Sequence, residues 1–139
     1  MPGATTSERA SELLDAARET LRALGRTATT PLVAQIAADG VRRIEWSGSW
    51  LDEPYVPGAQ GDPVQGDTRA LERRLHELTD AFEELVEDFE DDDPVRNANG
   101  VQTGSLAFAI TGATAAWLRR LAALERSADS GPRRATPPP

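Results

Sequence analysis

The chain of 139 residues contains no cysteine. A disulfide framework, a zinc site with thiolate ligands and a cysteine nucleophile are therefore excluded, and a reducing compartment is the expected setting. The chain also lacks lysine, so all 15 basic residues are arginine, and alanine is abundant. This composition is typical of proteins from GC-rich genomes such as those of actinobacteria, and it favours a bacterial or phage origin.

No apolar run is long enough to cross a membrane. The longest uncharged stretch extends from Asn97 to Leu118, but its beginning is polar and only the 14 residues SLAFAITGATAAWL remain. A spanning helix needs about 20 such residues. The first residues, MPGATTSERA, also lack the basic and apolar segments of a secretory signal peptide. We therefore expect a cytoplasmic protein without membrane contact.

Acidic residues are concentrated in one part of the chain. The formal net charge is −8, and the segment from Asp67 to Asp93 contains twelve acidic residues against three arginines. This segment alone carries a charge of −9, so the remainder is close to neutral. Because an acidic surface repels a phosphate backbone, we expect no nucleic-acid partner.

Apolar residues spaced three and four apart predict four helices. The first begins at the Thr5–Glu8 capping box and ends at Gly25, which has the position of a C-cap. The second begins at Thr30-Pro31, and its end is open between Gly40 and a point near Trp46.

The third helix is predicted over about 67–91 and the fourth over about 102–126. Pro94 and Asn99-Gly100 are turn residues and predict a break between these two helices. The fold class is therefore all-α, a four-helix bundle-like single domain over residues 1–128. A long loop rich in proline, glycine and aromatic residues covers 47–66 between helices 2 and 3, and a disordered tail covers 129–139.

Two helices have stripes that we expect to face the core. The stripe of the third helix consists of Leu71, Leu75, Leu78, Phe82, Leu85 and Phe89. The stripe of the fourth helix consists of Leu106, Ile110, Ala113, Trp117, Leu121 and Leu124.

His76 is the single histidine, and Glu72 and Asp80 lie one helical turn on either side of it. These three side chains share a helix face and have the residue types of a metal site. All three lie off the apolar stripe, so we expect a solvated surface histidine and no bound metal.

FEELVEDFEDDD contains EExxE, which resembles the first half of the magnesium-binding pattern of all-α nucleotide pyrophosphohydrolases of the MazG kind. The resemblance implies a carboxylate-dependent enzyme in which Glu84 and Glu87 contribute to the metal site. That family has a second acidic pair on the following helix, and residues 102–124 contain no acid. No other catalytic constellation is present, since GxSxG and glycine-rich phosphate loops are absent.

Trp46, Trp50 and Tyr55 bring most of the large aromatic rings of an aromatic-poor chain into ten residues of irregular sequence. Such rings anchor protein partners when they are exposed. These three residues are our candidates for partner binding. The alternative is that the rings fold back and cover the end of the bundle.

Trp46-Ser47-Gly48 resembles the WxG turn of the WXG100 proteins, helical hairpins exported by type VII secretion systems. The resemblance implies export without a cleaved signal peptide. In that family a second helix follows WxG directly, whereas Pro54, Pro57 and Pro63 follow it here.

The sequence thus predicts a non-enzymatic helical interaction protein of the adaptor, accessory or structural type. It would bind a protein partner or associate with itself, and we expect neither catalytic residues nor a cofactor. A WXG100-like secreted protein and a carboxylate-dependent metal enzyme are the alternatives.

Overall fold

The fold is all-α and bundle-like, as the sequence predicts. A computed structural model describes residues 6–51, 55–56, 64–89 and 93–135. Four helices pack against each other: α1 (Thr6–Thr27), α2 (Pro31–Ser47), α3 (Thr68–Asp88) and α4 (Pro94–Ala135). A short 3-10 helix, η1 (Gly48–Trp50), directly follows α2. The predicted N-cap Thr5 lies outside the described residues.

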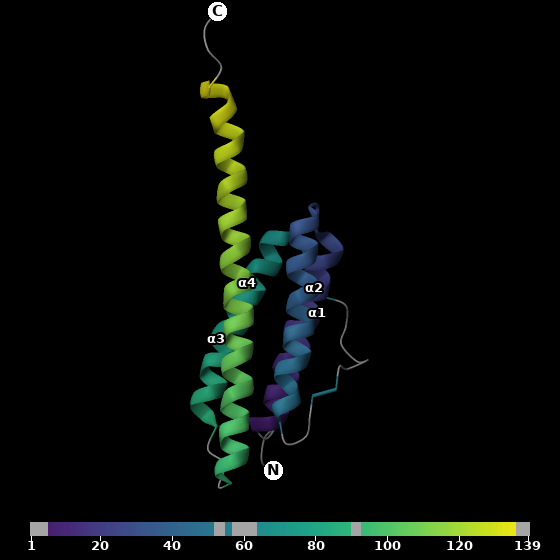
Figure 1. Ribbon diagram of the computed structural model, residues 1–139, viewed down its shortest axis with the longest axis vertical. Helices are drawn as coiled ribbons and strands as arrows, with labels where there is room; N and C mark the ends of the chain where they lie inside the picture. Colours follow the sequence, from purple (N-terminus) through teal and green to yellow (C-terminus); the bar gives the residue numbers. More distant parts are fainter. Residues whose placement is uncertain (1–5, 52–54, 57–63, 90–92, 136–139) are drawn as a thin grey trace, which may run out of the picture.

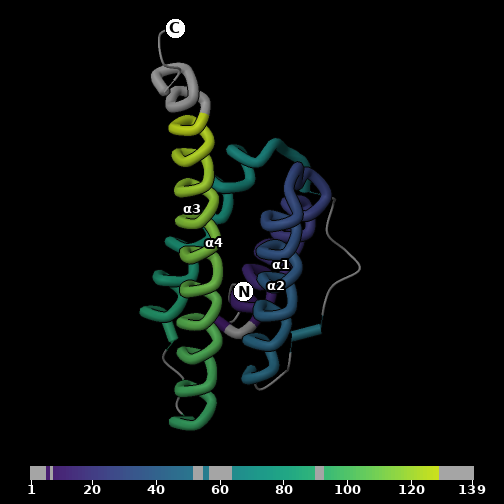
Figure 2. Tube along the Cα trace, turned by 45° about the horizontal axis from the view of Figure 1, so that its top comes forward, coloured from purple at the N-terminus to yellow at the C-terminus, as the bar shows by residue number. Residues whose placement is uncertain are grey.

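The helices alternate in direction within two antiparallel pairs, α1 with α2 and α3 with α4 (Figure 1). Helix α3 runs in the same direction as α2 (Figure 2). The pair α1–α3 and the pair α2–α4 are also in contact. The C-terminal part of α4 rises past the ends of the other three helices (Figure 1).

Local sequence signals account for the starts of three helices. Thr30 caps α2 by accepting a hydrogen bond from the Val33 amide at 3.3 Å, and Pro31 occupies the first turn. Asp67 caps α3 by accepting one from the Ala70 amide at 2.8 Å. Asp93 accepts one from the Val95 amide at 2.9 Å at the start of α4.

Several predicted boundaries were wrong. Gly25 does not end the first helix, which continues to Thr27. The second helix extends to Ser47, the longer of the two alternatives, and α3 ends at Asp88. Helix α4 begins at Pro94, because the Asp93 cap and the proline together initiate a helix rather than a break.

The fourth helix is therefore longer than predicted at both ends. Asn99 and Gly100 lie inside it, although they were predicted as turn residues. It also covers 129–135 of the predicted tail, while residues 136–139 lie outside the described residues. Within the predicted loop, η1 forms at 48–50, and residues 52–54 and 57–63 lie outside the described residues.

The core lies between the four helices and confirms the predicted stripe of α3. Every member of that stripe is buried. The largest fully buried side chains are Phe82, Leu14, Leu21, Leu24, Ile44, Leu71, Leu75 and Leu85. Burying Phe82 fully contributes about 1.5–3 kcal/mol.

Helix α4 presents small and hydroxylated residues to this core. Those that are buried include Thr103, Ala107, Thr111, Thr114, Ala115 and Leu118. The Thr79 hydroxyl donates to the Thr111 hydroxyl at 2.8 Å and links α3 to α4, and the Thr111 hydroxyl donates its own hydrogen to the Ala107 carbonyl at 3.0 Å. The Thr103 hydroxyl donates to the Ser47 carbonyl of α2 at 2.9 Å. Short side chains thus allow α4 to lie close to both neighbours.

Two glycines test how closely the helices approach. In Gly100→Ala the new Cβ would lie 2.2 Å from Phe89 Cε1, whereas in Gly25→Ala it would lie 3.6 Å from Ala37 Cβ. Alanine favours a helix interior over glycine by about 1 kcal/mol, so Gly25→Ala should stabilise the fold by about 0.5–1 kcal/mol. Gly100→Ala should instead destabilise it by about 1–3 kcal/mol, because the buried Phe89 ring has to move. Urea denaturation measures both, and a gain in stability from Gly100→Ala would contradict the close contact.

Candidate functional site

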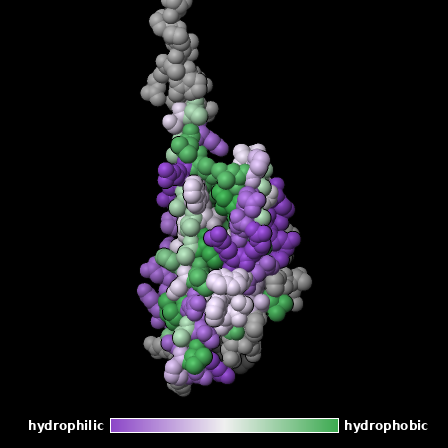
Figure 3. Space-filling view, in the orientation of Figure 1, coloured by the Kyte–Doolittle hydropathy of each residue, from purple (hydrophilic) through white to green (hydrophobic). Residues whose placement is uncertain are grey.

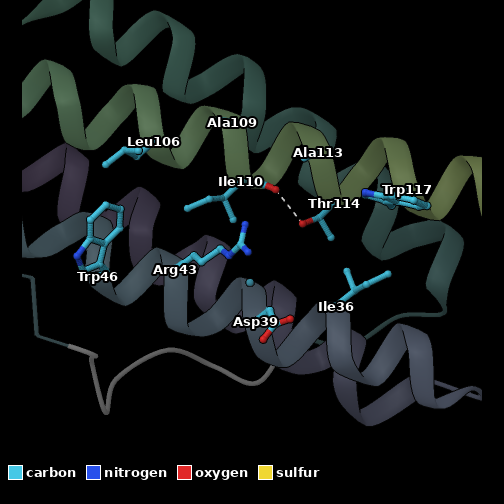
Figure 4. A pocket seen from close by; sticks show the side chains of 11 residues that line it. Ile36, Asp39, Arg43, Trp46, Leu106, Ala109, Ile110, Ala113, Thr114 and Trp117 are labelled. Carbon is cyan, nitrogen blue, oxygen red and sulfur yellow. Dashed lines mark hydrogen bonds between the residues drawn. The ribbon is translucent and has the colours of Figure 1, made fainter.

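The main candidate site is a groove between α2 and α4, which we call the α2–α4 groove. Its volume is about 580 Å³. From α2 it is lined by Ile36, Asp39, Gly40, Arg43 and Trp46. From α4 it is lined by Leu106, Ala109, Ile110, Ala113, Thr114 and Trp117. Figure 4 shows apolar side chains of α4 on one wall and the charged side chains of Asp39 and Arg43 from α2 on the other.

The groove exists because α4 turns its small residues inward. The stripe predicted as the core face of this helix was wrong: Leu106, Ile110 and Leu121 are only partly buried, and Ala113, Trp117 and Leu124 are exposed. The inward face consists mainly of threonine, alanine and glycine together with Leu118, so most of the larger apolar side chains are left at the edge. In Figure 3 hydrophobic atoms follow α4 and gather where it borders α2.

A tryptophan stands at each end of the groove. Trp46 and Trp117 are both 53% exposed. Their rings lie at opposite ends of the groove, with Ile110 and Arg43 between them (Figure 4). Trp46 also meets Trp50 edge to face, with ring centroids 6.2 Å apart. Exposed tryptophans present large apolar surfaces at low entropic cost, which is the property of anchoring residues in interfaces.

The α2 wall carries the charged groups of the groove. Asp39 is paired with Arg42 and accepts a hydrogen bond from Gln35 at 3.2 Å. Arg43 is exposed and extends from α2 toward α4 beside Ile110 (Figure 4). The groove therefore combines an apolar floor with a polar edge, a combination suited to binding an amphipathic segment.

The three candidate residues for partner binding, Trp46, Trp50 and Tyr55, differ in their exposure to solvent. Trp46 and Trp50 lie together at the surface, whereas Tyr55 is buried. The Tyr55 hydroxyl donates to Asp15 Oδ1 at 2.8 Å, and its amide donates to the Gly48 carbonyl at 3.0 Å. Burial, together with the hydrogen bond to the Asp15 carboxylate, raises the pKa of the Tyr55 phenol above its ordinary value. Tyr55 thus attaches the chain after η1 to α1.

Trp46-Ser47-Gly48 forms the end of α2 and the start of η1. The Ser47 hydroxyl is buried and donates to the Ile44 carbonyl at 2.7 Å. A Cβ on Gly48 would lie 2.4 Å from Tyr55 Cβ, so glycine is needed there for the chain to pass. The next α-helix begins only at Thr68, so the three residues do not form a turn between two helices.

The acidic residues of α3 are spread over its exposed side. His76 and Asp80 are exposed, and Glu72 pairs with Arg119 of α4 at 3.2 Å. Glu83, Glu84 and Glu87, the three glutamates of EExxE, are also exposed. Over the described residues, no three histidine, cysteine, aspartate or glutamate side chains are grouped as a metal site requires.

Sequence reasoning did not predict that Trp117, Ile36, Asp39 and Arg43 line the α2–α4 groove. A signal was present, since 97–118 is uncharged on all sides of the helix. A helix with one buried face normally carries charges on the opposite face. In the part of the chain that the structure describes, no helix is both long enough and apolar enough to cross a membrane.

The buried tyrosine predicts a defined response to alkaline pH. Its pKa in the folded chain lies above the value of about 10 expected when unfolded, because folding favours the neutral phenol. The contribution of the neutral Tyr55 phenol to the stability of the fold is complete below pH 10 and declines as the pH rises above 10. Since the sequence has no lysine and no cysteine, Tyr55 is the only side chain with an ordinary pKa between about 9 and 12.

We therefore expect the tyrosinate absorbance of the folded chain to appear above pH 10 and to rise together with the loss of helical circular dichroism. In Tyr55→Phe the alkaline loss of stability should be much smaller, although stability at neutral pH falls by about 1–2 kcal/mol with the lost hydrogen bond. An ordinary phenol titration with an intact helical signal would contradict the buried hydrogen bond.

Comparison of the chain with known proteins finds no match to a protein family, to a curated protein or to a solved structure. The resemblances to WXG100 proteins and to MazG-type pyrophosphohydrolases therefore rest on short motifs alone. The case for a function rests on the geometry of the α2–α4 groove.

Proposed function

We propose that this chain is a non-enzymatic helical interaction protein, of the adaptor, accessory or structural type, and that it binds protein through the α2–α4 groove. The observation that carries this proposal is the pair of half-exposed tryptophans, Trp46 and Trp117, at the two ends of one apolar groove. The chain has only three tryptophans, and all three are exposed.

The dimensions of the groove suit a helical segment. Trp117 lies eleven positions after Leu106 in α4, which corresponds to about 16 Å or three helical turns. A helix that docks in a groove uses apolar residues spaced i, i+4 and i+7, and a further apolar residue at i+11 would extend this row over about the same distance. Such a helix would lie along α4 and place its apolar residues against Leu106, Ile110 and Trp117.

The polar edge of the groove would orient the bound segment. Arg43 lies exposed on the α2 wall, where its guanidinium can pair with a carboxylate at the margin of a docked helix. An exposed pair of this kind contributes little to affinity but disfavours wrong orientations. The proposal therefore assigns binding energy to the tryptophans and orientation to Arg43.

A double substitution tests the groove. The tagged wild-type chain, Trp46→Ala/Trp117→Ala and the control Phe108→Ala would be used to capture proteins from native lysate. Phe108 is 38% exposed on α4 but does not line the groove. Proteins identified by mass spectrometry would then be purified and titrated by calorimetry.

We expect the double substitution to weaken binding of the captured protein about 30-fold or more, which corresponds to the loss of an anchoring residue worth about 2 kcal/mol. Phe108→Ala should bind within about threefold of wild type. Circular dichroism must show the same helical content in all three chains. Equal binding by the double variant, or the absence of any groove-dependent partner including the chain itself, would refute the proposal.

A further inference from the structure

We propose that the partner of the α2–α4 groove is a second copy of this chain, bound antiparallel through the outward face of α4. This inference rests on the proposed function and names its partner. It depends on two observations, the absence of charge on the outward face of α4 and the separation of charge along the bundle.

The outward face of α4 is exposed and uncharged over more than five turns. The exposed residues on this face are Ala98, Gln102, Ser105, Ala109, Ala113, Ala116 and Trp117. No charged residue occurs anywhere between Asn97 and Leu118. Because a surface helix normally carries charges toward water, a face of this composition is typical of a helix covered by another helix. Its alanines would allow a second helix to approach to about 8 Å.

The charges of the bundle are separated along its long axis. At the end where α3 begins, the exposed arginines include Arg69, Arg73, Arg74, Arg119, Arg120 and Arg126. At the end where α3 stops and α4 begins, the exposed acids include Glu83, Glu84, Glu87, Asp88 and Asp93. Asp67, Glu72 and Glu125 lie at the first end and Arg9 and Arg96 at the second, so each end keeps its net sign.

This charge separation determines which arrangement of two copies is favourable. If two copies met through α4 in parallel, arginines would face arginines and acids would face acids. In an antiparallel arrangement with two-fold symmetry, the basic end of each copy lies against the acidic end of the other. Pairing the region of Arg126 with the region of Asp93 places the two-fold axis near Ala109, midway between them.

The available surface is of the size that a stable dimer requires. From Ala98 to Leu124 the helix is about 40 Å long. With α2 beside it at about 8–10 Å, the face is about two helices wide. It therefore approaches the roughly 800 Å² per partner that a standard interface buries. Trp46 and Trp117 would lie within this interface.

Sedimentation equilibrium of the full chain tests the proposal. We expect a dimer whose dissociation constant rises about tenfold when the salt concentration increases from ~50 to ~500 mM, because the charged ends are screened. Ala113→Arg, at the centre of the face, should weaken dimerisation at least about 100-fold. The control Ala38→Arg introduces the same side chain on the exposed side of α2 away from the groove and should leave the dimer unchanged.

The absence of cysteine allows the orientation to be tested with single cysteines and a mild oxidant such as copper phenanthroline. Ala109→Cys, near the two-fold axis, should form a disulfide-linked dimer. Gln102→Cys and Ala116→Cys should each form little disulfide alone, but a mixture of the two should form the mixed disulfide, because these positions face each other in the antiparallel arrangement. Efficient disulfide formation by all three alone would indicate a parallel dimer and overturn the proposal.

The remaining outcomes separate this inference from the proposed function. A wild-type chain that is monomeric at ~100 µM, or a dimer that survives Ala113→Arg with unchanged affinity, overturns the inference. If Ala113→Arg loses its helical circular dichroism, Ala109→Arg replaces it in the same comparison. A monomer that still captures another protein through Trp46 and Trp117 leaves the proposed function standing, whereas a monomer without a groove-dependent partner refutes both.

Discussion

The close packing of α4 against α3 and α2 is the constraint on which the rest of the structure depends. The contact is made by short side chains such as Thr79 and Thr111, whose hydroxyls hydrogen bond 2.8 Å apart inside the core. Thr103 makes the corresponding bond to the α2 backbone. Among the described residues, no buried side-chain nitrogen or oxygen lacks a hydrogen-bond partner, so this polar interior carries no uncompensated desolvation cost.

The surface properties follow from this packing. Because mainly threonine, alanine and glycine occupy the inner face of α4, most of its large apolar residues stand at the edge or face outward. The groove beside α2 and the exposure of Trp117 are thus two results of the same choice of inner face. With the other stripe inside, Trp117 would lie in the core.

The aromatic segment shows how neighbouring residues of similar type take different roles. Trp46 ends a regular helix and therefore points where the helix places it, toward the groove. Tyr55 lies after η1 in the chain, and its hydroxyl donates a hydrogen bond to Asp15 on α1. Within this segment Trp46 and Trp50 are exposed, whereas Tyr55 is buried against the bundle. Gly48, which contacts Tyr55 closely, begins η1 and lies between Trp46 and Tyr55 in the chain.

The sequence by itself determined the helical class, the number of long helices, the start of α2 at Thr30-Pro31 and the buried stripe of α3. These features depend on local periodicity and on side chains bonding to nearby backbone, which a sequence shows directly. It also indicated Trp46, Trp50 and Tyr55 as candidates for partner binding, but not the place of Trp46 and Trp117 at opposite ends of one groove.

Only the tertiary structure decided which face of α4 is buried. Both faces of residues 97–118 are uncharged, so hydropathy favoured the stripe with larger side chains, and that prediction was wrong. The choice depends on fit to neighbours that are distant in the chain, such as Thr79 against Thr111 and Phe89 against Gly100. Steric fit and buried hydrogen bonds between helices outweighed the larger apolar area of the other stripe, and neither can be read from periodicity along one helix.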